Sequence, residues 1–143
     1  DYVARKGKPM IISSGMATLA EVYEGVQTIR NAGNHDIILL QCTTNYPSTL
    51  EDANVRTMVS MSESMNVLTG YSDHVPNNYA CYAAVALGAC LIEKHFTLDT
   101  SIGSSSSPII SILVSRKSRY LEVGSVPSFA ASSFLPVVIS STN

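Results

Sequence analysis

The chain alternates between two patterns of apolar and polar residues over its first hundred positions. Short apolar runs typical of buried strands are separated by stretches whose apolar residues recur at the spacing of a helix face. The predicted strands lie at 9–12, 36–42, 67–70 and 89–96, and the predicted helices at 19–29, about 51–65 and 78–88. Strands that each cross over through a helix predict a parallel βα array, with helices covering the sheet.

Particular residues mark the ends and the inner faces of these helices. Thr18 and Glu21 form a capping-box pattern at the start of the first helix, and Gly33 is placed to end it. We expect the second helix to begin near Glu51 and to turn its core-filling residues inward, namely Val55, Met58, Met61 and Met65.

Four such units predict half of a (β/α)8 TIM barrel, because a complete barrel takes about 250 residues. A small doubly wound sheet uses the same local pattern. The sequence leaves both folds open, since periodicity does not report whether a sheet closes on itself.

The character of the chain changes near residue 100, so we divide it into an α/β segment, 1–100, and an atypical tail, 101–143. The tail has a serine run at 104–107 and apolar stretches at 109–114 and 135–139 that lack the helix-and-strand rhythm. Its basic residues, Arg116, Lys117 and Arg119, have no interleaved aromatic residues and predict a solvated patch. We expect poorly specified or disordered structure there.

Composition narrows the class of protein. The 143 residues are 45% hydrophobic with a net charge of −2, a balance that favours neither nucleic acid nor a membrane as a partner. Three cysteines without a CxxC pair predict reduced thiols and a cytoplasmic location. The chain starts with Asp1 rather than Met, and we expect that the natural protein begins earlier.

Polar residues gather at the predicted carboxyl ends of the strands, where parallel α/β folds place function. The two-residue strand period puts one set on a common face: Ser13 and Gly15; Cys42, Thr44 and Tyr46; Ser72 and His74; Glu93 and His95. Asp73 and Lys94 face the other way and are expected to pair with each other or with helix residues.

His74 and His95 are predicted to reach one cation from adjacent strands. Two neutral imidazoles beside Glu93 suit Mn, Fe, Zn or Mg-like chemistry. Hydrogen-bonded core histidines explain the pair equally well. The segment from Ser13 to Gly15 also has two interpretations: an ordinary turn or a phosphate-binding nest. His35 is expected to be a surface turn residue.

Four motifs, in this order, resemble the sialic acid synthase (N-acetylneuraminate synthase) family: GKPMIISSGM at 7–16, CTTNYP at 42–47, GYSDH at 70–74 and EKHFT at 93–97. The resemblance runs over residues 2–99. It implies the last four strands of a barrel and the condensation of phosphoenolpyruvate with N-acetylmannosamine, or a related amino sugar, to a 2-keto acid with release of phosphate. It also implies a homodimer for the full-length parent.

By the same resemblance, His74 and His95 are the ligands of a divalent metal, Mn or Mg. Glu93 and Tyr46 are implied as catalytic residues at the aldehyde and sugar end. Ser13, Ser72 and Thr44 are implied as phosphoenolpyruvate contacts, and Tyr46 also as a sugar contact.

Three departures from the family pattern limit these expectations. The first half-barrel, with its phosphoenolpyruvate-binding residues, and the C-terminal antifreeze-like domain are absent, and Thr100 to Gly103 stands where the family has a Pro-Gly-Pro-Asp-type loop. We expect a frameshift, or a spliced or truncated reading, and an inactive fragment. A legionaminic, pseudaminic or spore-coat sugar synthase and a non-catalytic remnant remain alternatives.

Overall fold

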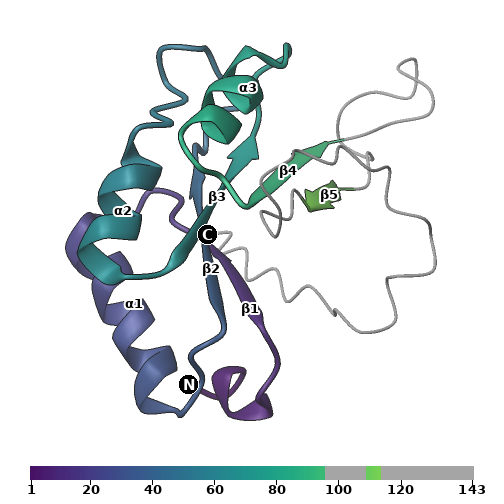
Figure 1. Cartoon of the computed structure of the whole chain (residues 1–143). Coiled ribbons are helices and arrows are strands. Elements are labelled where there is room, and N and C mark those ends of the chain that lie inside the picture. Colours follow the sequence, from purple (N-terminus) through teal and green to yellow (C-terminus); the bar gives the residue numbers. More distant parts are fainter. Residues whose placement is uncertain (96–108, 114–143) are drawn as a thin grey trace.

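The computed structural model describes residues 1–95 and 109–113 (Figure 1). A short 3₁₀ turn, η1 (Ala4–Lys6), precedes five strands and three helices. The strands are β1 (Met10–Ser13), β2 (Ile37–Cys42), β3 (Leu68–Asp73), β4 (Leu91–His95) and β5 (Ile109–Leu113). The helices are α1 (Leu19–Asn31), α2 (Thr57–Met65) and α3 (Tyr79–Ala86).

The strands form one sheet in the order β1-β2-β3-β4-β5. The first four are parallel, and β5 pairs antiparallel with β4. A doubly wound sheet reverses its strand order at a switch point, whereas the four parallel strands follow chain order. They have the arrangement of consecutive barrel units.

The helices pack on one face of this sheet. Two hydrophobic clusters lie between helices and sheet: the first joins α1 and α2 to β1 and β2, and the second joins α2 and α3 to β3 and β4. Leu39 and Tyr71 are fully buried in these clusters. Side chains alternate along a strand, so the neighbours of Leu39 and Tyr71 in their own strands point to the opposite face of the sheet. In a closed barrel, that face would be the interior.

Strands β3 and β4 approach closely at Gly70. A Cβ atom there would lie 2.4 Å from the Leu91 carbonyl oxygen and 2.7 Å from Leu40 Cδ2. Real Cβ atoms essentially never come so close, so only glycine allows the two strands and the Leu40 side chain to pack as they do.

The first helix confirms its sequence signals. Glu21 N donates to Thr18 Oγ1 and Thr18 N donates to Glu21 Oε2, at 3.3 and 2.7 Å, which completes the capping box. Gly33 has a φ of +87° and follows the last turn.

The second helix begins at Thr57, so the expected start near Glu51 was wrong. Asn54, at a φ of +49°, interrupts the helix, and Thr49 and Asp52 hydrogen-bond to each other in a separate turn. Its methionines are buried as predicted: Met58, Met61 and Met65.

The beginning of the chain is fixed to the amino-terminal end of the sheet by Asn34. Its buried side-chain amide donates to the carbonyl oxygens of Ala4 and Lys8, at 3.3 and 2.8 Å, and its Oδ1 accepts from Asp36 N at 3.0 Å. The 3₁₀ turn is thereby joined to the turn that precedes β2.

None of the described helices is long and apolar enough to span a membrane. Of the tail, only β5 is described; the serine run, the basic patch and the expectation of disorder lie outside the described residues.

Candidate active site

The candidate site lies at the carboxyl ends of β3 and β4. Their pairing places Ser72 opposite Glu93 and Asp73 opposite Lys94. His74 follows the last of these rungs on one strand and His95 on the other. The period of two therefore sends both histidines to the face that carries Ser72 and Glu93, as the sequence predicted.

Three rings form a cluster on this face. The centroids of His74 and His95 are 5.3 Å apart, and the Tyr46 ring lies 4.2 Å from His74 and 5.9 Å from His95. The Tyr46 hydroxyl is 2.7 Å from His74 Nε2. Tyr46 reaches the histidines from the loop after β2, where the Tyr46–Pro47 peptide bond is cis.

The surroundings of both members of this hydrogen bond favour the neutral form. Burial and the neighbouring His95 lower the pKa of His74, while burial raises the pKa of the Tyr46 phenol. A neutral phenol can donate its proton to a neutral Nε2 when the ring proton is on Nδ1. Neutral imidazole is also the form that binds metal ions.

Glu93 is the buried carboxylate of the site. Its side chain accepts a 2.7 Å hydrogen bond from the Ser72 hydroxyl, and the residue is only 6% exposed. This bond fixes the carboxylate next to the strand-end histidines, because Ser72 and Glu93 lie one rung before Asp73 and Lys94.

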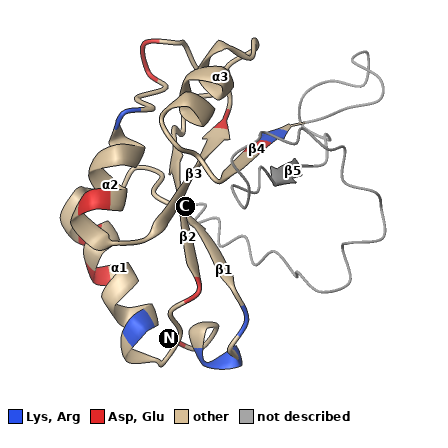
Figure 2. Cartoon of the chain, viewed as in Figure 1, with Lys and Arg blue, Asp and Glu red and all other residues tan. Residues whose placement is uncertain are grey.

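The polar pair on the opposite face confirms another expectation. Lys94 Nζ forms an ion pair with Asp73 Oδ2, and Figure 2 shows the acidic colour at the end of β3 and the basic colour in β4. The carboxylate of Asp73 is fully buried. These charges therefore lie on the helix side of the sheet, behind the histidines.

Sequence reasoning missed two supports of His74. Cys42 Sγ lies 4.0 Å from His74 Nδ1, and burial raises the pKa of this thiol. The His74 carbonyl oxygen accepts from Ser48 N at 3.0 Å, and the Ser48 hydroxyl is 2.8 Å from that of Thr43. The strand period had placed Cys42 on this face, whereas the role of Ser48 depends on how the loop folds back.

A pocket of about 510 Å³ opens beside these groups. It is lined by Tyr46, Pro47, Asp73, His74, Val75, Pro76, Lys94 and His95. Ser13 and Thr44 are exposed, and neither forms a described hydrogen bond to Tyr46, His74 or Glu93. The described structure thus joins five of the seven candidate residues and leaves Ser13 and Thr44 apart from them.

The separation of the two histidine rings is compatible with one shared divalent ion. Two imidazole nitrogens that share an ion at about 2.1 Å place their ring centroids roughly 4.5–5.5 Å apart, and the observed separation is 5.3 Å. Within the described residues, no group of three or more His, Cys, Asp and Glu side chains is arranged to hold a metal. The pair alone could supply two ligands.

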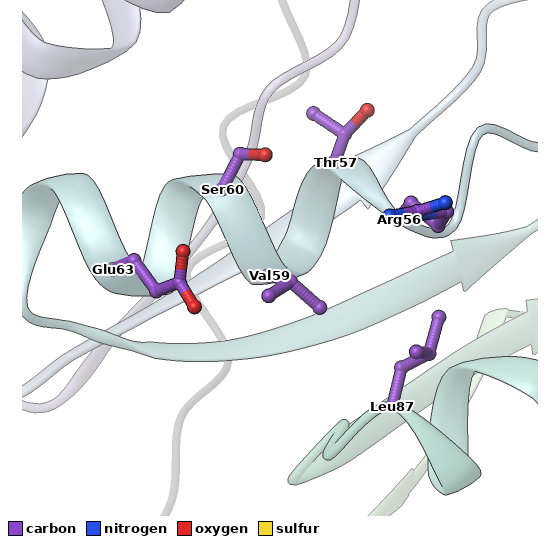
Figure 3. Close-up of a pocket in the computed structure, with 6 residues that line it drawn as sticks. All are labelled: Arg56, Thr57, Val59, Ser60, Glu63 and Leu87. Carbon is purple, nitrogen blue, oxygen red and sulfur yellow. The ribbon is translucent and has the colours of Figure 1, made fainter.

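A second pocket, of about 670 Å³, lies between α2 and the end of α3 (Figure 3). Its lining consists of Arg56, Thr57, Val59, Ser60, Glu63 and Leu87. None of the candidate residues lines it, so the chemistry is concentrated at the strand ends.

Comparison with known proteins gives a match to the model of the NeuB family over residues 1–112. The pseudaminic acid synthase of Campylobacter jejuni is 44% identical over 105 residues, which are 73% of this chain and 31% of that protein. The chain therefore spans about a third of the length of this curated relative.

Solved structures agree with this match. The spore coat polysaccharide biosynthesis protein SpsE of Bacillus subtilis aligns with a TM-score of 0.70 and 35% identity, over 73% of this chain and 30% of that one. The N-acetylneuraminic acid synthetase of Leptospira borgpetersenii aligns with a TM-score of 0.65 and 30% identity, over 70% of this chain and 35% of that one.

Proposed function

Because the chain belongs to the NeuB family, the family of sialic acid synthases, we propose that it is the carboxyl-terminal part of a synthase barrel. The intact parent would condense phosphoenolpyruvate with N-acetylmannosamine, or a related amino sugar, and release phosphate. The observation that carries the proposal is the cluster of Tyr46, His74 and His95 beside the buried Glu93. Such a cluster at the strand ends of a barrel is typical of an active site.

We assign His74 and His95 as ligands of a divalent Mn or Mg ion. When bound, the ion would polarise the carbonyl oxygen of the open-chain sugar and stabilise the alkoxide that develops there. The centroid separation of 5.3 Å and the lowered pKa of His74 support this assignment. Positions that the two histidines leave open would be available to water and substrate.

The remaining side chains would orient the reactants. Glu93, held by Ser72, would accept hydrogen bonds at the aldehyde end, and Tyr46 would contact the sugar from the mouth of the pocket. Ser72, together with Ser13 and Thr44, would contact phosphoenolpyruvate. Ser13 and Thr44 are exposed in the described structure, so their part in the proposal depends on how the remainder of the parent barrel surrounds them.

The identity of the amino sugar has a specific alternative. The 44% identity to a pseudaminic acid synthase supports a pseudaminic acid precursor as substrate as much as N-acetylmannosamine. Similarity to SpsE supports a spore-coat sugar in the same way. Phosphate release by the parent enzyme, measured with each amino sugar and phosphoenolpyruvate, would choose between them.

A non-catalytic remnant is the second candidate. The matches to synthases are compatible with it but do not favour it over a synthase. Expression of this chain together with the rest of a parent barrel would distinguish the synthase from the remnant. Restored phosphate release supports the synthase, and no phosphate release with any of the substrates supports the remnant.

His74→Ala tests the metal assignment in the parent enzyme. We expect loss of turnover with Mn or Mg by at least about 100-fold, because catalysis would lose a ligand of its electrophile. His35→Ala is the matched control, since His35 is an exposed histidine in the turn before β2. Full activity of His74→Ala would remove His74 from the ligand set.

A further inference from the structure

We propose that Asp73 and Lys94 are positioning residues that hold His74 and His95 level with each other from the opposite face of the sheet. The inference rests on the proposed function only in its metal-binding consequence. Its geometric core concerns how two adjacent strand ends are locked together.

Asp73 and Lys94 are direct partners on the last paired rung of β3 and β4, and each immediately precedes a histidine. Ser72 and Glu93 form the rung before, joined by a hydrogen bond on the site face. Two consecutive rungs are thus fastened on opposite faces, so a slip or a twist of either strand end would break side-chain bonds on both sides.

Lys94 also fixes the segment that follows His74. Besides the ion pair with Asp73, Lys94 Nζ donates to the carbonyl oxygens of Val75 and Asn77, at 2.5 and 3.0 Å. An ammonium group has three donors, and all three are used. Lys94 therefore holds the chain on both sides of His74 as well as its own strand.

The carboxylate of Asp73 binds groups on both sides of the strand end. Asp73 Oδ1 accepts from Val75 N at 3.1 Å, which closes a turn around His74, and Oδ2 accepts from the Cys81 thiol at 3.0 Å. The backbone of His74 is therefore enclosed by bonds from its own neighbour, from Lys94 and from Ser48 N. These contacts leave the imidazole little freedom except rotation about its side-chain bonds.

The carboxylate of Asp73 is completely buried and the Lys94 side chain is 26% exposed. Removing a charge pair from water is costly, and replacing such a pair by uncharged groups is often neutral for stability. The pair is therefore not expected to be there for stability. A role in positioning explains why it lies directly behind the two histidines.

The test uses the full chain and the paired variant Asp73→Asn/Lys94→Met. The variant leaves no unpaired buried charge and keeps an oxygen for Val75 N. Its matched control is Asp1→Asn/Arg5→Met, which removes the two charges of the exposed ion pair in the first turn. Two NMR measurements are made: the ¹⁵N signal of His74 Nε2 without metal, and the broadening of the His74 and His95 ring signals by added Mn²⁺.

In the Asp73→Asn/Lys94→Met variant, we expect the Nε2 signal to move, because the hydrogen bond to the Tyr46 hydroxyl would be disturbed. The Mn²⁺ concentration needed for half-maximal broadening should rise about tenfold, the effect typical of groups that orient metal ligands. The thermal midpoint should match that of the control.

Unchanged histidine signals in the paired variant would overturn the proposal. Loss of the fold in that variant would overturn it too, because the pair would then support the fold rather than the histidines. If Mn²⁺ broadens neither ring in the unaltered chain while the Nε2 signal still moves in the variant, the metal assignment fails and the positioning role stands.

Discussion

Glu93 illustrates how single residues shape this site. A carboxylate that is only 6% exposed needs hydrogen-bond donors in place of water, and Ser72 provides one at 2.7 Å. The Ser72 hydroxyl therefore stabilises the buried carboxylate of Glu93 and orients its oxygen atoms.

Ser72→Ala should destabilise the fold by about 1–3 kcal/mol, because it leaves a buried acceptor without its partner. Urea denaturation followed by circular dichroism would measure the change. Ser64→Ala serves as the control, since Ser64 lies on the exposed side of α2 and bonds only within its own helix. Equal stability of the two variants would show that another group satisfies Glu93.

The positions of most site residues could be read from the sequence, because alternation along a strand is a strictly local property. It placed Ser72 and His74 with Glu93 and His95, and it placed Asp73 and Lys94 on the other face. The approach of Cys42 to His74 Nδ1 and the bond from Ser48 N could not be read in this way. Both depend on distances between elements, which periodicity does not encode.

At the scale of elements, two glycines inside the described helices and strands play opposite roles. Gly70, in β3, has no room for a Cβ atom, whereas a Cβ atom at Gly25, in α1, would meet no atom within 4 Å. The first glycine is required by packing, and the second only weakens its helix.

Gly70→Ala should therefore destabilise the protein by about 1–3 kcal/mol or more, as expected for overpacking against backbone. Gly25→Ala should stabilise it by about 0.5–1 kcal/mol, because alanine favours a helix interior. Thermal melts of both variants would measure the pair. A Gly70→Ala melt as high as that of the unaltered chain would contradict the close approach of β3 and β4.

The helices differ in how far the sequence fixes their ends. In α1 the signals are local hydrogen bonds, those of Thr18 and Glu21, and the prediction was confirmed. In α2 the apolar spacing was read correctly, but a separate turn at Thr49–Asp52 and the left-handed Asn54 precede the helix. Spacing reports which face is buried and does not report where the hydrogen-bond ladder begins.

At the scale of the whole molecule, the described sheet has β1 at one edge. In a closed barrel such an edge would pair with another strand. Met10 N donates to the carbonyl oxygen of Asp36, just before β2, and Ser14 N to that of Leu40 in β2, at 2.8 and 2.9 Å. By the alternation of a parallel ladder, Ile11 N and Ser13 N point away from β2 and are available to another strand.

We expect the isolated chain to self-associate as its concentration rises, because an available strand edge pairs with other chains. Ile11→Pro should reduce this association while leaving the β1–β2 bonds intact, since proline removes a donor at the outer edge. Ile12→Pro, which removes a donor facing β2, should instead disrupt the sheet. Sedimentation velocity over a concentration series would measure both; a strictly monomeric unaltered chain would contradict the expectation.

The pattern of strands and helices separated a barrel from a doubly wound sheet poorly, because both are built from the same βα unit, and only the family resemblance favoured the barrel. What separates them is the order of strands in space and the face on which the helices lie. Both features depend on contacts between units. In this structure, β1 to β4 follow chain order in the sheet, and the two hydrophobic clusters lie between the sheet and helices on one face.

The attachment of the first turn by Asn34 has a practical consequence for handling the molecule. Asp1 lies at the amino-terminal end of the sheet, near the bottom of Figure 1, whereas His74 and His95 follow the opposite ends of their strands. An affinity tag or fluorophore joined at Asp1 would rest on a segment anchored to the turn before β2. A sensor surface coupled there would present the histidine pocket outward, unobstructed by its own tether.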